Sequence, residues 1–314
     1  MGQAFVFPGQ GSQAVGMGLA LAQSDAAARQ VFAEVDDALG RSLSTIAAEG
    51  PEELLTATEN AQPALMAVSI AVLRMLEARG LVLSDAVSYV AGHSLGEYSA
   101  LVAAGALPLS DAARLLELRG QAMQRAAPVG VGAMAAILGL GFKAVSAIAD
   151  AAAEGDEICV AANDNTPEQV VISGHAAAVE RAMEAAKAEG AKRAVPLPVS
   201  APFHCPLMQP AAEEMRAALA DAPLSAPAVP LIANITAAPV SEAEDIRRLL
   251  VEQITGRVRW RESLVWLAGQ GVSRLAELGS GKALTGMARR IDPSFEARAV
   301  NTPEDVDSFM SVPA

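Results

Sequence analysis

The chain has 314 residues, of which 52% are hydrophobic, so it can bury the core of one large domain or two smaller ones. Its formal net charge of −13 argues against nucleic acid or an anionic membrane surface as a partner. Two cysteines, no apolar run near the roughly 18 residues of a membrane span, and no signal-peptide pattern lead us to expect a cytoplasmic globular protein.

The first part of the chain alternates strand and helix patterns. An apolar strand, AFVF, runs into the glycine-rich segment PGQGSQ, and apolar residues later recur three or four apart. The predicted elements are a strand at 4–7, a helix at 62–79, a strand at 87–91, a helix to about 104 and a helix at 109–126. This alternation predicts an α/β fold with a mostly parallel sheet.

The order of elements changes between residues 128 and 198. Strands at 132–140, 157–163, 169–174 and 192–199 and helices at 142–154 and 176–190 follow a β-α-β-β-α-β order, with a turn at 164–168. We interpret 128–198 as a ferredoxin-like subdomain inserted into an α/β core of residues 1–127 and 199–314. The core then continues with helices near 208–220 and 243–254, a strand near 273–279 and an irregular tail.

A serine stands between two glycines in GHSLG, Gly92 to Gly96, with a strand pattern before it and a helix pattern after it. In such a G-x-S-x-G turn the hydroxyl is exposed at the carboxyl end of the sheet, and the following helix points its N–H groups at the same place. This context favours Ser94 as a nucleophile that forms an acyl-enzyme, over a chance match in a glycine-rich loop.

A serine nucleophile needs a base, and the chain has three histidines. We expect His93 to project away from the hydroxyl and to shape the turn, and His175 to lie at the surface. His204 follows a predicted strand, where such sheets place the general base, so by elimination it is the candidate. Its neighbour Cys205 is expected to be buried, and the group that orients the imidazole is left open between an acid and a main-chain carbonyl.

The oxyanion hole is expected from the main-chain N–H of Leu95 and a second N–H from the loop PGQGSQ, with Gln10 as the candidate. The same loop is close to a dinucleotide fingerprint, which we rank lower because Pro8 interrupts the passage from strand to turn. The segment GSGKALTG, Gly279 to Gly286, only echoes a phosphate loop, since Ala283 replaces the required Ser or Thr.

Six segments together resemble the malonyl-CoA:acyl carrier protein transacylase family of bacterial fatty-acid synthesis. They occur in the family's order and spacing and are FVFPGQGSQ, GHSLGEYSALVAAGAL, LRGQAMQ, NDNTPEQVVISG, KRAVPLPVSAPFH and ELGSGKALTG. The resemblance implies an α/β-hydrolase-like core with a ferredoxin-like subdomain. It also implies Ser94 as nucleophile, His204 as base, Gln10 and Leu95 as oxyanion donors and Gln253 as the carbonyl that orients the histidine.

The resemblance further implies that Arg119 binds the malonyl carboxylate, and we add Asn163 and Phe203 as candidate substrate-binding residues. A guanidinium binds a carboxylate with two parallel hydrogen bonds, and we expect Gly120 beside it to leave room for the ligand. Leu95 after the serine and the bulky ring of Phe203 before the histidine are typical of members that use malonyl groups rather than branched ones.

The implied partners are malonyl-CoA and a phosphopantetheinylated acyl carrier protein, in a ping-pong reaction through a malonyl-serine ester. We expect a monomer with no metal and no bound cofactor, because the thioester is already activated. Carrier proteins of this kind are acidic, so Lys192 and Arg193 are candidate contacts to CoA or the carrier, and an arginine cluster at 257, 259 and 261 is a second candidate.

Three other functions remain open at this point. An acyltransferase serving a polyketide synthase or a malonate decarboxylase is the nearest alternative. A serine esterase or thioesterase, and a non-catalytic scaffold or NAD-binding module, fit the sequence less well because of Arg119 and the resemblance over nearly the whole chain.

Overall fold

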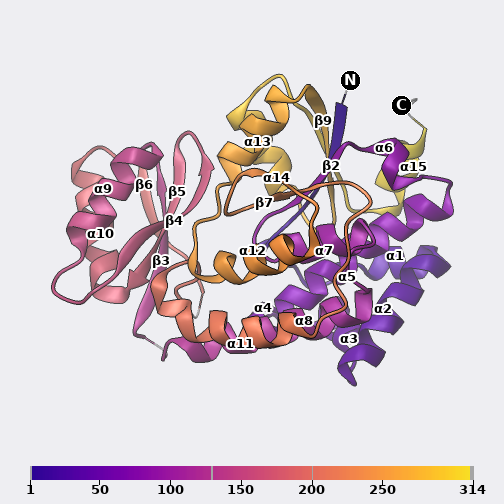
Figure 1. Ribbon diagram of the computed structural model, residues 1–314, viewed down its shortest axis with the longest axis horizontal. Helices are drawn as coiled ribbons and strands as arrows, with labels where there is room; N and C mark the ends of the chain where they lie inside the picture. Colours follow the sequence, from indigo (N-terminus) through magenta and orange to yellow (C-terminus); the bar gives the residue numbers. More distant parts are fainter. Residues whose placement is uncertain (1, 129, 200, 312–314) are drawn as a thin grey trace.

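The computed structural model describes residues 2–128, 130–199 and 201–311. Its larger sheet has five strands in parallel and an antiparallel edge strand, as the alternating pattern predicts (Figure 1). In spatial order the strands are β10 (Glu296–Val300), β9 (Val272–Leu278), β1 (Gly2–Phe7), β2 (Tyr89–Gly92), β7 (Leu231–Ala233) and β8 (Ala238–Val240).

Both faces of this sheet are covered. Along β1, Phe5 and Phe7 pack into one core cluster, while Ala4 and Val6 pack into another on the opposite face. Because successive side chains of a strand point to opposite faces, a strand buried on both sides reads as a continuous apolar run. AFVF therefore lies in the interior of the sheet.

The larger cluster is built mainly from helices of the first half of the chain. It includes residues from α1 (Leu19–Ser24), α2 (Ala26–Leu39), α3 (Leu43–Glu49), α4 (Glu52–Thr56), α5 (Thr58–Ala78), α6 (Leu83–Ala86), α7 (Gly96–Ala103), α8 (Leu109–Ala126), the 3-10 turn η1 (Pro206–Met208), α11 (Gln209–Ala220), α12 (Ala243–Thr255) and α15 (Pro303–Met310). The opposite face is covered by α13 (Trp260–Gly269) and α14 (Ala283–Ile291).

One helix of the described residues, α5, is long and apolar enough to cross a membrane by length and composition. However, 83% of that stretch is buried inside the protein, so α5 is a core helix. It begins at Thr58, four residues before the predicted start. The predicted start was late because the apolar repeat does not extend into the mostly polar first turn, Thr58–Ala61, and Pro63 lies in the helix interior.

A second, antiparallel sheet has the strand order of the predicted ferredoxin-like unit and lies at the left of Figure 1 with its two helices. Its elements are β3 (Gly132–Leu138), α9 (Phe142–Ala152), β4 (Cys159–Thr166), β5 (Gln169–His175), α10 (Ala176–Ala188) and β6 (Arg193–Pro196). It has its own core against α9 and α10. The limits of the unit, 128 and 198, remain a prediction.

The two sheets are joined through the end of β4. The N–H of Asp164 donates to the carbonyl of Val258 at 2.9 Å, and the N–H of Val258 donates to the carbonyl of Ala162 at 2.9 Å. Arg261 pairs with the fully buried Asp164 carboxylate at 2.7 Å. Part of the predicted turn at 164–168 is strand, because Asp164 and Thr166 pair with Val170 and Gln169 of β5.

The prediction of an irregular tail after this strand was wrong. After β9 the chain forms α14, then β10 at the edge of the larger sheet, then α15. The strand β10 has only five residues, and α14 contains Gly286, so neither pattern stands out locally. Both elements are stabilised by packing on β9, which local periodicity does not report.

Candidate active site

Ser94 lies in the tight turn between β2 and α7. Its backbone is left-handed, with φ of 54°, which is unusual for a residue with a side chain. A Cβ at Gly92 would lie 1.9 Å from the carbonyl carbon of Gly96, and a Cβ at Gly96 would lie 2.3 Å from the carbonyl oxygen of Phe7. The two glycines are therefore required because backbone passes directly over backbone at this turn.

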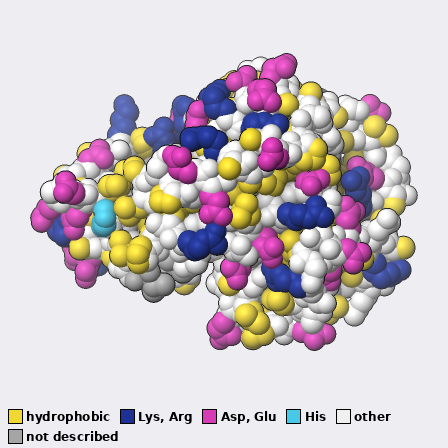
Figure 2. Space-filling model, turned by 60° about the horizontal axis from the view of Figure 1, so that its bottom comes forward, with side chains coloured by type: hydrophobic (Ala, Val, Ile, Leu, Met, Phe, Trp, Pro, Cys, Tyr) yellow, Lys and Arg dark blue, Asp and Glu magenta, His cyan; other side chains and the backbone are white. Residues whose placement is uncertain are grey.

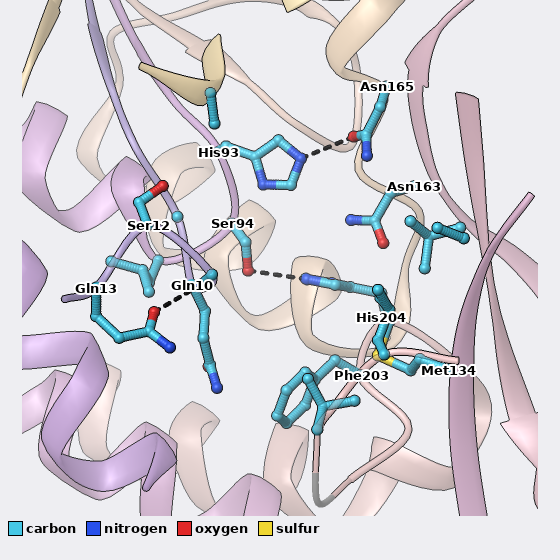
Figure 3. Close-up of a pocket in the computed structure, with 18 of the residues that line it drawn as sticks. Gln10, Ser12, Gln13, His93, Ser94, Met134, Asn163, Asn165, Phe203 and His204 are labelled. Atoms are coloured by element: carbon cyan, nitrogen blue, oxygen red, sulfur yellow. Dashed lines mark hydrogen bonds between the residues drawn. The ribbon is translucent and has the colours of Figure 1, made fainter. Parts of the chain in front are cut away.

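The Ser94 hydroxyl points at His204 (Figure 3). Its Oγ lies 2.8 Å from Nε2 of His204, and Nδ1 of the ring lies 2.8 Å from the main-chain carbonyl oxygen of Gln253. Because a carbonyl only accepts, Nδ1 carries the proton, and Nε2 is left to accept from the serine hydroxyl. The structure thus brings Ser94, His204 and Gln253 together from three distant segments.

The imidazole of His204 is held neutral. Burial, followed by the nearby charge of Arg119, lowers the pKa of His204 to about 3, against the contribution of the Gln253 carbonyl, which raises it. A neutral imidazole is the form that can take a proton from a hydroxyl. His204 also has a left-handed backbone, with φ of 59°, so both partners of the pair stand in strained turns.

Gln10 and Leu95 lie beside the hydroxyl, in the wall of one cavity with Ser94. Within the described residues, neither of their main-chain N–H groups donates a hydrogen bond to the protein. The side chain of Gln10 reaches Oγ1 of Thr58 at 3.5 Å, so it is directed along the cavity wall. Two free N–H donors near a nucleophile can stabilise a developing oxyanion.

Arg119 is buried, with 1% of its surface exposed, and it reaches Ser94 from α8. Nη1 donates to Oε1 of Gln62 at 2.7 Å, and Nη2 donates to Oγ of Ser94 at 3.1 Å and to Oε1 of Gln253 at 2.9 Å. Its Nε has no partner in the part of the chain that the structure describes. Nε and Nη2 form one edge of the guanidinium, so this edge can donate two hydrogen bonds to a carboxylate that takes the place of Ser94 Oγ at Nη2.

A cavity of about 330 Å³ connects these groups. Asn163 and Phe203 line it, as do Gln10, Leu95 and Arg119. In Figure 3 Asn163 lies close to the ring of His204, and Phe203 lies on the side of the cavity away from His93. All but three of the predicted site residues line this cavity. The main-chain carbonyl of Gln253 contacts His204, which lines the cavity, and Lys192 and Arg193 lie outside the lining.

The two remaining histidines are engaged elsewhere. Nε2 of His93 lies 2.9 Å from Oδ1 of Asn165, and in Figure 3 this ring nitrogen points at Asn165 rather than at the Ser94 hydroxyl. Burial lowers the pKa of His93. His175 is half-buried rather than at the surface as predicted, because its Nδ1 accepts the N–H of Ile158 at 2.8 Å. Cys205 is buried, as predicted, and its thiol donates to the carbonyl of Pro202 at 3.1 Å.

The sequence profile of the acyl transferase domain family matches residues 4–272, which is most of the chain. The chain belongs to this acyl transferase family. It is 47% identical over 300 residues to the malonyl CoA-acyl carrier protein transacylase of Escherichia coli (strain K12), covering 96% of each chain.

Solved structures of similar enzymes have the same fold as this acyltransferase. The acyl-carrier-protein-S-malonyltransferase from Bartonella henselae is 57% identical, with a TM-score of 0.97 and coverage of 99% of this chain and 98% of that one. A malonyl-transacylase in complex with its type II PKS acyl-carrier protein is 44% identical, with a TM-score of 0.95 and coverage of 98% of both chains.

The sequence analysis missed three buried polar residues of this acyltransferase. Oδ1 of Asn234 accepts the N–H of Ser94 at 2.8 Å, and its Nδ2 donates to the carbonyl of Gly92 at 2.7 Å, so Asn234 braces the serine turn. Glu97 accepts the N–H of Asn234, and Gln62 accepts from Arg119. Glu97 directly follows the GHSLG turn on the predicted helix, where a lone carboxylate in an apolar stretch was the available signal.

The expectation that Gly120 leaves room for a ligand was wrong. A Cβ at this position would lie 2.5 Å from Cα of Glu59 and 2.7 Å from the carbonyl carbon of Thr58. Gly120 therefore allows α8 to approach the start of α5. The ligand space lies on the other side of Arg119, at Ser94.

The basic residues outside the cavity differ in their exposure and in their pairing with acidic residues. Nζ of Lys192 pairs with Glu168 at 2.8 Å, but the Lys192 side chain is 70% exposed. Arg193 begins β6 with an exposed side chain. In the cluster, Arg261 pairs with Asp164, while Arg257 and Arg259 both pair with Glu262. Figure 2 shows both signs of charge interspersed over the face that it draws. The cluster is therefore the weaker candidate for an anionic partner.

In the glycine-rich segment at 279–286, two N–H groups at the start of the helix are already bound to a side chain. The buried carboxylate of Glu277 accepts the N–H of Leu284 at 3.0 Å and of Thr285 at 2.7 Å. These are donors that a phosphate would need at the N-terminus of α14. The structure thus agrees with the sequence analysis, which set this resemblance to a phosphate loop aside.

Proposed function

We propose that this protein transfers a malonyl group from malonyl-CoA to the phosphopantetheine thiol of an acyl carrier protein, through a malonyl ester of Ser94, in fatty-acid synthesis. The observation that carries the proposal is the position of the Ser94 hydroxyl, 2.8 Å from Nε2 of His204 and 3.1 Å from Nη2 of Arg119. One hydroxyl thus contacts a neutral base and a buried cation that fits a carboxylate.

In the first half-reaction, Nε2 of His204 takes the proton of Ser94 as Oγ attacks the thioester carbonyl. The carbonyl oxygen becomes an oxyanion, which accepts from the N–H groups of Gln10 and Leu95. When the tetrahedral intermediate collapses, the carbon–sulfur bond breaks and the CoA thiolate takes the proton from His204. The imidazolium is stabilised meanwhile by the Gln253 carbonyl at Nδ1.

The second half-reaction reverses these steps with a different thiol. His204 takes the proton of the carrier's phosphopantetheine thiol, and the sulfur attacks the ester carbonyl of malonyl-Ser94. The carbon–oxygen bond breaks, and Ser94 recovers its proton from His204. A carrier contact through Lys192 and Arg193 would bring the acidic carrier toward the cavity despite the net charge of −13.

Selection of the malonyl group is assigned to Arg119, with Asn163 and Phe203 as further substrate-binding residues. The Nε–Nη2 edge of the guanidinium can bind the terminal carboxylate with two hydrogen bonds, one from the unpartnered Nε and one from the Nη2 hydrogen that Ser94 now accepts. An acetyl group would leave this buried charge unpaired, so malonyl is favoured. The ring of Phe203 borders the cavity and limits branching at the α-carbon.

We place the enzyme in the cytoplasm as a monomer, with residues 128–198 as an inserted subdomain. A polyketide carrier protein is the second candidate acceptor, because one similar structure is a malonyl-transacylase in complex with a type II PKS acyl-carrier protein. Parallel assays with a fatty-acid carrier and a polyketide carrier would distinguish the two acceptors by their kcat/KM values.

Intact-mass spectrometry after incubation with malonyl-CoA tests the proposed function. We expect a gain of one malonyl group, lost again when a phosphopantetheinylated carrier protein is added, and no gain in the Ser94→Ala variant. Rapid release of free malonate without any acceptor would instead indicate a hydrolase. An unchanged mass of the native protein would indicate a scaffold.

A further inference from the structure

Glu97 is a buried carboxylate that the proposed reaction does not use. It lies in the first turn of α7 with 2% of its surface exposed. One carboxylate oxygen accepts the N–H of Asn234 at 2.6 Å, and the other accepts Nε2 of Gln253. Both contacts are donors, as an ionised carboxylate requires.

Arg119, on the other side of Gln253, is a buried positive charge. Its guanidinium is buried and donates to Gln62, Ser94 and Gln253, none of which carries a negative charge. A buried charge without a counter-charge is costly, and the same holds for Glu97.

The side-chain amide of Gln253 connects the two charges. Its Nε2 donates to Glu97, and its Oε1 accepts from Nη2 of Arg119 at 2.9 Å. The amide has a donating NH2 group at one end and an accepting oxygen at the other. Glu97 can only accept hydrogen bonds while it is ionised, and Arg119 can only donate them. The orientation of the amide is therefore determined by the charges at its two ends.

We propose that Glu97 is a positioning residue that acts through the Gln253 amide to hold Arg119 in place for the substrate carboxylate. This inference rests on the proposed function and adds to it the counter-charge of the carboxylate site. Burial raises the pKa of Glu97 to about 8, and the charge of Arg119 opposes that shift, so Glu97 carries its full charge only above about pH 8. The kinetic test is therefore made above that pH.

The test is the ratio of kcat/KM for malonyl-CoA to kcat/KM for acetyl-CoA in the otherwise intact enzyme. In Glu97→Gln the new amide cannot accept from both neighbours, so Gln253 loses its fixed orientation and Arg119 loses its acceptor. We expect the ratio to fall about tenfold, in the range of coupling energies between contacting residues. An equal loss for both donors would overturn the proposal.

Two further variants show whether the effect passes through Arg119. Gln253→Met keeps the main-chain carbonyl for His204 but removes the amide, and it should lower the ratio as Glu97→Gln does. If Glu97→Gln does not fold, Gln253→Met decides alone, and an unchanged ratio overturns the relay. In the Arg119→Ala background Glu97→Gln should cause no further fall in the ratio, whereas an additive fall contradicts the inference.

Glu277→Gln is the matched control, because Glu277 is also a buried carboxylate whose two oxygens accept N–H groups, those of Leu284 and Thr285. It should lower the Tm without changing the ratio. Failure of the proposed function would already be seen in the native enzyme as absence of malonyl-Ser94, so it is distinguishable from a failure of this inference.

Discussion

The two walls of the active-site cavity differ in kind. The wall from the larger sheet and its helices is polar and closely hydrogen-bonded, and it holds Ser94, Arg119 and Gln62. The wall from the smaller sheet and the segment after it carries the apolar side chains of Met134, Ala136, Val171, Leu197 and Phe203, beside the polar Asn163, Asn165, Gln169 and His204.

Apart from His204, which stands on the second wall, the difference separates chemistry from selection by shape. Groups that move protons or bind charge must be held within tenths of an ångström, so they stand in a network of buried hydrogen bonds. Groups that only exclude bulk can be apolar side chains. Substitutions in the polar wall should therefore change reaction with the charged substrate, and substitutions in the apolar wall should change the tolerated size.

Arg119→Ala should have the largest effect among the variants that compare the two walls. We expect malonyl transfer to fall by roughly a hundredfold, because a buried hydrogen-bonded charge pair with the substrate is lost, while acetyl transfer falls much less. Steady-state kinetics with both CoA donors measure this. Arg119→Lys is the control, because it keeps the charge but loses the fork, and equal loss for both donors would refute the carboxylate role.

Phe203→Ala should show a smaller effect of a different kind. Removing the ring makes room beside the α-carbon, so kcat/KM for methylmalonyl-CoA should rise about tenfold relative to malonyl-CoA. Phe309→Ala is a suitable control, since its ring packs on Phe5, 5.9 Å between centroids, and does not line the cavity. An unaltered preference would argue that another side chain sets the size limit.

Reversal of charge at Lys192 and Arg193 should have a modest effect, because both residues are exposed. The double change to Glu should raise KM for the carrier protein roughly two- to fivefold and leave acylation by malonyl-CoA unchanged. Arg216→Glu, an exposed position on α11, serves as the control. Identical carrier kinetics in both variants would remove Lys192 and Arg193 as contacts.

The pH dependence of acylation should show the smallest change. Because burial lowers the pKa of His204 to about 3, the base stays unprotonated well below the ordinary histidine range. The value of kcat/KM for acetyl-CoA, which has no carboxylate for Arg119 to bind, should therefore stay flat from about pH 8 down to about pH 5. A fall centred near the ordinary histidine pKa would show that the ring is solvated in the free enzyme.

Much of the fold followed from local patterns. Short apolar runs predicted the strands at 4–7 and 87–91, and the helix predicted at 109–126 has the bounds observed for α8, Leu109–Ala126. The patterns failed where tertiary packing decides, as in β10 and α14, which are short elements held against β9, and at the start of α5, whose first turn is mostly polar.

The candidate site likewise has residues that the sequence predicted and residues that it did not. The spacing GHSLG by itself predicted a serine turn, and the small number of histidines pointed to His204, because few residue types can act as nucleophile and base. Asn234 and Glu97, and the direction in which Arg119 faces, could not be predicted, since their contacts join segments far apart in the chain. Hydrogen bonds between distant segments depend on how the elements pack, and only the tertiary structure determines that.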